Sequence, residues 1–178
     1  IYKPYSTNNK KPPLILKAHS GPTSSFDGSF NLEVQYWTSR GWCVAEVNYG
    51  GSSGFGRRYR ERLNNLWGVA DSADCIALAR SLEEERLIDP SRIVISGNSA
   101  GGLTALTALY KTDIFKAAFC KYPVINLDDM RLNTHRFERY YLNSLVGDYD
   151  NNKKKYFERS PNNNLDKINK PILIFHGK

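Results

Sequence analysis

Residues 93–102 read IVISGNSAGG and place Ser99 at the centre of a G-x-S-x-G pattern. A serine hydroxyl is a weak nucleophile until a base takes its proton, so the side chain must project to where a histidine can reach it. The pattern achieves this when it forms a strained turn between a strand and a helix that approach each other closely. We therefore predict that Ser99 is a catalytic nucleophile; the alternative is a structural Gly/Ser turn.

The residues on both sides of Ser99 supply the elements that such a turn requires. Residues 93–95 form a short apolar run, as in a strand that is buried on both faces. Residues 100–111 repeat apolar side chains at the helical spacings of three and four. A helix that begins just after Ser99 directs free N–H groups and its positive dipole end at the same point. The Ala100 N–H is therefore predicted to stabilise an oxyanion.

The wider chain alternates apolar strands with amphipathic helices. Strands are predicted at 14–18, 42–47, 116–122 and 172–175, besides the one before Ser99. Helices are predicted at 30–39, 57–63, 69–85, 100–111 and 137–146, and the Asn-rich segments 151–152 and 162–164 are predicted to be loops. This alternation indicates an α/β fold, a mostly parallel sheet with helices on both faces.

Several polar residues follow the ends of the predicted strands. These residues are His19, Tyr49, Ser99, Tyr122 and His176. Right-handed crossovers align the strand ends along one edge, where open α/β sheets hold their sites. The turn HSGP at 19–22 is predicted to supply a second oxyanion donor, the Gly21 N–H.

The composition disfavours several other functions. The chain has 178 residues and no apolar run near the roughly 18 residues that span a bilayer, so no membrane partner is expected. The net charge of +7 comes from scattered Lys and Arg residues, which argues against a nucleic-acid partner. The loop 48–56, NYGGSSGFG, lacks the order of a nucleotide-binding loop, and C-x-x-C motifs and helical His pairs are absent. We therefore expect no cofactor and no metal.

The three cysteines all lie in apolar surroundings, within GWCVAEV, ADCIALA and AAFCKYP. We expect them to be buried free thiols, which favours a reducing compartment and hence the cytoplasm. The chain starts at Ile1 and ends within PILIFHGK. We therefore expect residues 1–178 to be one partial domain of a longer protein, truncated at its C-terminal end.

Five segments together resemble a known family. They are HSGP (19–22), NYGGSSGFG (48–56), WGVAD (67–71), IDPSRIVISGNSAGG (88–102) and SPNNNLDKINKPILIFHG (160–177). In this order they resemble the catalytic domain of the prolyl oligopeptidase family of serine peptidases, in particular its acylaminoacyl-peptidase and dipeptidyl-peptidase-like branch. The resemblance implies an α/β-hydrolase fold, a short peptide substrate and an N-terminal β-propeller that restricts access to the site.

The resemblance also implies roles for individual residues. It makes Ser99 the nucleophile, and it gives the oxyanion hole the N–H groups of Gly21 and Ala100. The segment after strand 116–122 matches the family's S1-pocket region, so Val124, Leu127 and Met130 are candidates for an apolar lining; ordinary packing is the alternative. The chain departs from the family's commoner HGGP, because Ser20 replaces a glycine.

The resemblance places the triad Asp and His after Lys178. The histidines present, His19, His135 and His176, are each expected to be structural rather than the general base. Residues 1–178 alone are therefore expected to hydrolyse peptides inefficiently. Two alternatives to a peptidase stay open: a carboxylesterase or lipase-like hydrolase, and a non-catalytic scaffold that keeps the fold without the triad.

Overall fold

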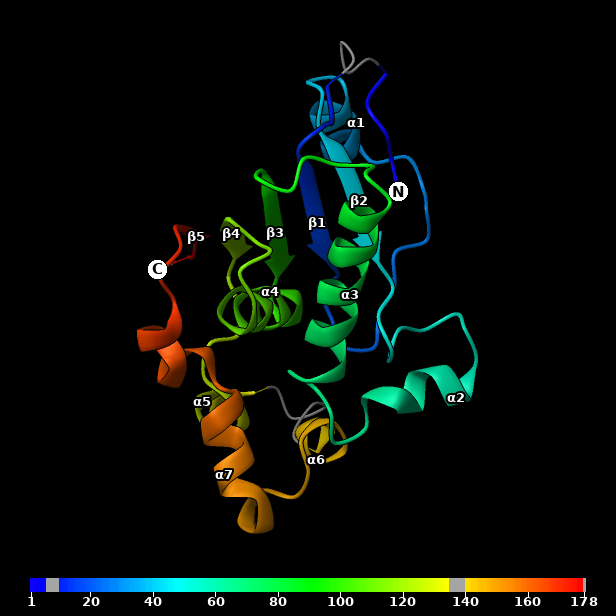
Figure 1. Ribbon diagram of the computed structural model, residues 1–178. Helices are drawn as coiled ribbons and strands as arrows, with labels where there is room; N and C mark the ends of the chain where they lie inside the picture. The colour runs from blue at the N-terminus through cyan, green and yellow to red at the C-terminus, as the bar shows by residue number, and fades with distance from the viewer. Residues whose placement is uncertain (6–9, 135–139, 178) are drawn as a thin grey trace.

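A central sheet of five strands organises the molecule, as the computed structural model shows for residues 1–5, 10–134 and 140–177 (Figure 1). The strands are β1 (Leu14–Ala18), β2 (Cys43–Val47), β3 (Ile93–Asn98), β4 (Ala117–Lys121) and β5 (Ile172–Phe175). Their order is β2-β1-β3-β4-β5, and every neighbouring pair is parallel. The predicted parallel sheet is confirmed, and its strand ends share one edge.

Strands β1 and β3, which precede the HSGP turn and Ser99, are neighbours inside the sheet. β1 lies between β2 and β3, with Leu16 paired to Ala45 on one side and to Ile95 on the other. All three of these side chains are fully buried. The short apolar runs therefore form strands because both faces of the sheet are covered there, which removes apolar surface from water.

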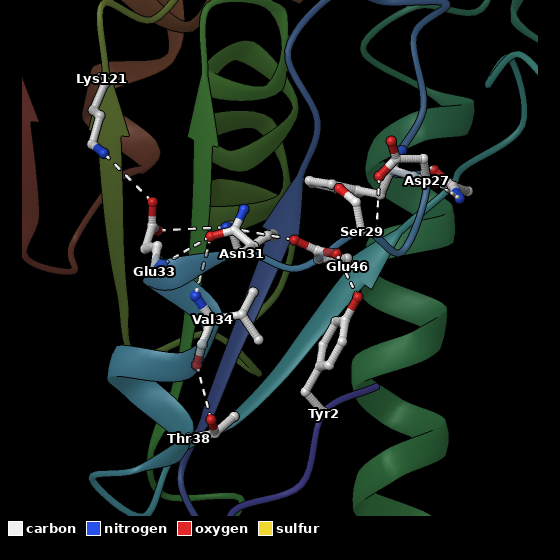
Figure 2. A network of polar contacts seen from close by, with 12 residues as sticks. Tyr2, Asp27, Ser29, Asn31, Glu33, Val34, Thr38, Glu46 and Lys121 are labelled. Carbon is white, nitrogen blue, oxygen red and sulfur yellow. Dashed lines mark hydrogen bonds and ion pairs between the residues drawn. The ribbon is translucent and has the colours of Figure 1, made fainter.

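Helices cover both faces of the sheet. The α-helices are α1 (Leu32–Thr38), α2 (Arg57–Arg60), α3 (Ala70–Glu84), α4 (Ala100–Lys111), α5 (Leu127–Asn133), α6 (Tyr141–Leu145) and α7 (Tyr149–Arg159). The described part of the chain also contains the 3₁₀ helices η1 (Glu61–Leu63) and η3 (Pro161–Lys167). α3 and α4 pack on one face of the sheet, and α1 packs on the other (Figures 1 and 2). In the described residues, no helix has the length and apolar character needed to cross a bilayer.

The C-terminal third differs most from the sequence prediction. Asn151 and Asn152 lie within α7, and residues 162–164 lie within η3, so the prediction of loops is wrong for both segments. The predicted helix 137–146 corresponds to α6, which begins at Tyr141; residues 137–139 lie outside the described part of the chain. The predicted helix 57–63 is divided between α2 and η1.

A charged network holds α1 against its face of the sheet. Lys17 on β1 lies between two carboxylates, with its Nζ 3.5 Å from Glu33 of α1 and 3.6 Å from Glu46 of β2. Lys121 on β4 also approaches Glu33, and the Tyr2 hydroxyl donates to Glu46 (Figure 2). The Lys17 side chain is only 13% exposed and that of Glu46 only 8%, so each charge needs the other.

The three cysteines are free and buried, as predicted. Burial raises the pKa of each thiol, to about 12 for Cys120. Since the thiolate is the reactive form, these residues belong to the packing of the core and not to its chemistry.

Candidate active site

Ser99 occupies the turn between β3 and α4, with φ 51° and ψ −117°. Residues other than glycine rarely adopt this backbone conformation. The turn is held in place by the end of β4: the Ser99 N–H donates to the Lys121 carbonyl at 3.1 Å, and the Ser99 carbonyl accepts from the Val124 N–H at 3.0 Å. The serine side chain remains half-buried at the strand-end edge of the sheet. This is the strand–turn–helix geometry that the sequence predicted.

The glycines around Ser99 are required by close backbone contacts. A Cβ added to Gly97 would lie 2.0 Å from the Gly101 carbonyl oxygen. A Cβ added to Gly101 would lie 2.4 Å from the carbonyl oxygen of Ala18 at the end of β1. Strand β3, helix α4 and strand β1 can therefore meet only if these two positions lack side chains.

Helix α4 presents its N-terminus at the same point. Ala100 is its first residue and is 2% exposed, and the Ser99 side chain makes no capping hydrogen bond there. The first N–H groups of a helix lack partners within the helix, and the dipole adds positive potential at that end. This arrangement suits an oxyanion beside Ser99, which is the role predicted for the Ala100 N–H.

The HSGP turn follows β1 and lies against the first turn of α4, because a Cβ added to Gly101 would lie 2.4 Å from the carbonyl oxygen of Ala18 and 2.6 Å from that of His19. Gly21 has φ +72°, which favours glycine, and its carbonyl accepts from the Ser24 N–H at 3.0 Å. The two backbone groups predicted to form an oxyanion hole thus belong to adjacent segments.

His19 packs under this turn and is 4% exposed. Its ring stacks on Tyr49 with the centroids 4.1 Å apart, and its Nε2 lies 2.7 Å from the Ser52 hydroxyl. Its Nδ1 lies 3.0 Å from the Gly21 carbonyl oxygen. Burial lowers the pKa of the imidazole, so the neutral form is favoured. These contacts agree with the structural role predicted for His19.

Among the described residues, no hydrogen bond joins another histidine to Ser99. His176 follows β5, and its exposed ring contacts the Gly177 carbonyl at 2.8 Å. His135 lies outside the described residues.

A buried carboxyl, which was not predicted as a functional residue, connects α3 with α4. Asp71 of the WGVAD segment is fully buried and accepts a 2.5 Å hydrogen bond from the Thr104 hydroxyl of α4. Burial raises the pKa of Asp71, and the Thr104 hydrogen bond opposes that rise. Lys111 at the end of α4 donates to the Gly68 carbonyl at 2.8 Å. The sequence gives no clear signal for this role, because α3 also contains Asp74, Glu83 and Glu84.

The three candidates for the S1 pocket occupy different environments. Val124 follows β4, and its N–H bonds directly to the Ser99 carbonyl. Leu127 is fully buried at the start of α5, where its N–H donates to the Ser160 hydroxyl. Met130 is partly buried against the core. Only Val124 is bonded directly to the turn, and the lining role of all three stays a prediction.

Comparison with known proteins then decides the family. The family model of the prolyl oligopeptidase family matches residues 28–178. The chain belongs to the prolyl oligopeptidase family. The order β2-β1-β3-β4-β5, with Ser99 between β3 and α4, is that of the α/β-hydrolase fold shared with its structural neighbours.

Two solved structures and one curated relative illustrate the similarity. A puromycin-hydrolyzing peptidase of Mycobacterium tuberculosis shares 43% identity at a TM-score of 0.92, covering 95% of this chain and 26% of its own. Pyrococcus horikoshii acylaminoacyl peptidase shares 26% identity at a TM-score of 0.87, covering 98% of this chain and 28% of its own. An acylamino-acid-releasing enzyme of Arabidopsis thaliana is 32% identical over 96% of this chain and 23% of its own length. The chain thus spans about a quarter of these relatives.

Proposed function

We propose that this chain is the nucleophile-bearing part of a serine peptidase that cleaves short peptides through an acyl-enzyme. The observation that carries the proposal is the strained turn at Ser99, between β3 and the N-terminus of α4, in a member of the prolyl oligopeptidase family. The relatives described above are named as peptidases or as a peptide-releasing enzyme, which favours this function over a non-catalytic scaffold.

The mechanism follows from the positions of the backbone groups. The Ser99 hydroxyl attacks the carbonyl carbon of the scissile peptide bond while a general base takes its proton. The resulting oxyanion accepts hydrogen bonds from the Ala100 and Gly21 N–H groups. The tetrahedral intermediate collapses, the leaving amine takes the proton from the base, and water then hydrolyses the acyl-enzyme. Val124, Leu127 and Met130 are proposed to line the S1 pocket.

The general base is proposed to be a histidine outside residues 1–178, oriented by an aspartate that also lies outside them. His19 supports this assignment, because both of its ring nitrogens already contact groups of the fold. We also propose an N-terminal β-propeller in the parent protein, since the relatives are about four times longer than this chain. A cytoplasmic location is proposed from the three buried free thiols.

The test compares peptide and ester hydrolysis by the full-length protein. Short peptidyl anilides and p-nitrophenyl esters are assayed with the wild type and with Ser99→Ala. The proposal expects anilide hydrolysis that falls by at least about 10³-fold in Ser99→Ala. Unchanged anilide turnover in this variant would refute the nucleophile. Turnover of esters alone would instead favour the carboxylesterase or lipase-like alternative.

A further inference from the structure

A cavity lined by four cationic side chains lies at the edge of the sheet opposite to Ser99. Its volume is about 330 Å³, and its lining residues are Lys3, Pro4, Lys10, Lys11, Pro12, Arg86 and Leu87. Helix α3 runs in the opposite direction to the strands, so the residues after it lie beside the starts of β1 and β3 (Figure 1). Because the strands are parallel, Ser99 lies at their other ends. The cavity is therefore separate from the candidate active site.

The backbone around the cavity is held by hydrogen bonds between two segments that are distant in the sequence. The Asp89 N–H donates to the Pro12 carbonyl at 2.8 Å, and the Arg92 guanidinium donates to the Lys11 carbonyl at 3.3 Å. The two prolines of the lining further restrict the backbone, since the proline ring fixes φ. The segment before β1 and the segment after α3 thus form two connected walls.

The end of α3 brings Arg86 to the cavity. The Arg86 N–H donates to the Glu83 carbonyl at 2.9 Å, and the Leu87 N–H donates to the Leu82 carbonyl at 3.0 Å. These two bonds form a Schellman motif, whose left-handed position is usually glycine. Arg86 occupies that position with φ 57°. An arginine side chain is therefore present where the backbone itself favours glycine.

The charges around the cavity are not balanced by acidic residues. Among the residues that the structure describes, none with a carboxylate lines the cavity, and none of the ion pairs includes its four cations. Residues 1–12 contain three lysines and no Asp or Glu. The negative end of the α3 dipole favours one nearby cation but does not account for four. A bound anion would remove the repulsion among them, which salt screens only over about 8 Å.

The size and the donors of the cavity indicate the class of anion. About 330 Å³ is at the lower end of the range for small-molecule sites, which is roughly 300–1,000 Å³. The guanidinium of Arg86 can bind two oxygens of one phosphate, and lysines bind phosphate as point charges. A single carboxylate would neutralise only one of the four cations, whereas linked phosphate groups carry several negative charges.

We propose that this cavity binds a small polyanion with phosphate groups, held by Arg86 and by Lys3, Lys10 and Lys11. This binding site goes beyond the proposed peptidase function and does not depend on Ser99.

Calorimetric titration of the full-length protein with inorganic pyrophosphate tests the site. We expect one pyrophosphate per chain and an affinity that falls as salt is added. Arg86→Gly removes a cation and introduces the residue that φ 57° favours, so the variant is expected to fold like the wild type and to bind about 10-fold more weakly. The matched control is Arg58→Gln, an exposed arginine of α2 that does not line the cavity, and it is expected to change the affinity less than about 2-fold.

Lys11→Gln gives a second test at the other wall, with an expected loss of about 5-fold or more. Absence of binding by the wild type at about 1 mM pyrophosphate, or equal affinities of Arg86→Gly and Arg58→Gln, overturns the proposal. Ser99→Ala is expected to bind pyrophosphate like the wild type, so failure of the peptidase function leaves this test intact.

Sedimentation with phosphatidylcholine vesicles, with and without phosphatidic acid, identifies the source of the phosphate. Binding that requires phosphatidic acid and is lost in Arg86→Gly assigns the site to a lipid headgroup. Pyrophosphate binding without vesicle binding assigns it to a soluble phosphate compound. Vesicle binding that is equal in the wild type and in Arg86→Gly, together with no pyrophosphate binding, contradicts a site in this cavity.

Discussion

The strained backbone at Ser99 predicts that the nucleophile lowers the stability of its own domain. A non-glycine residue at φ 51° and ψ −117° costs about 1–3 kcal/mol, and glycine adopts this conformation without that cost. Glycine also increases the conformational entropy of the unfolded chain, which reduces this gain in stability by about 0.4–1 kcal/mol. Ser99→Gly is therefore expected to abolish catalysis and to stabilise the domain by about 1 kcal/mol.

Ser99→Ala is the matched control, since it also removes the hydroxyl but keeps the Cβ that causes the strain. Hydrogen exchange of peptides from β3 and α4 measures the opening of this domain within the full-length protein. A gain of about 1 kcal/mol slows exchange about fivefold in Ser99→Gly relative to Ser99→Ala. Equal protection in the two variants, or weaker protection in Ser99→Gly, contradicts the strain argument.

Three further predictions use the same exchange measurement on the full-length protein. Gly101→Ala, whose Cβ would lie 2.4 Å from a β1 carbonyl oxygen, is expected to lower the stability of the domain by about 3 kcal/mol. Gly50→Ala is its control and is expected to lower the stability far less, because the added Cβ meets only the side chain of Arg62. Equal losses of stability in the two variants would contradict the close approach of α4 to β1. Burial raises the pKa of Asp71, so the folded state holds that proton more tightly than the unfolded state does. The wild type should therefore lose stability relative to Asp71→Asn as the pH rises above the ordinary carboxyl range, and a gain in stability over that change would contradict the direction of the pKa shift. Lys17→Met leaves the buried Glu46 carboxylate without its cationic partner and is expected to lower the stability by about 3 kcal/mol. Lys121→Met, at a more exposed pair, is expected to lower it by less than about 1 kcal/mol. Equal losses of stability would show that burial of the ion pair does not matter.

The strands and the helix after Ser99 could be predicted because their signals are local. The bounds predicted for β1, α4 and β5 coincide with those observed, β2 begins one residue later than predicted, and β4 is one residue shorter at each end. Each is a short apolar run or a regular apolar repeat bounded by turn residues. The parallel order then follows from the alternation of strands and helices.

Helices α5 and α7 could not be predicted from apolar spacing. α5 begins after Asn126, whose side chain accepts from the N–H groups of Asp128 and Asp129. α7 begins after Asp148, whose side chain accepts from the Asn151 N–H. Residues that favour loops in a linear reading act here as helix caps, and packing against neighbouring elements decides between the two outcomes.

The serine site shows how much the surroundings of a motif matter. Residues 50–54, GGSSG, also satisfy G-x-S-x-G, and Ser52 comes after strand β2 as Ser99 comes after β3. No regular helix begins there, and Ser52 is fully buried against His19 while Ser99 is half-buried in its strained turn. The helix after Ser99 was therefore the informative part of the sequence. The contact between Ser52 and His19 joins residues 33 apart and has no local signal.

The most direct test of the account is the site of covalent modification by a fluorophosphonate. The full-length protein is incubated with the reagent, digested, and its peptides are mapped by mass spectrometry. We expect one adduct, on Ser99, that disappears in Ser99→Ala and persists in Ser72→Ala. An adduct on another residue, or labelling that persists in Ser99→Ala, would contradict the assignment of Ser99 as the nucleophile.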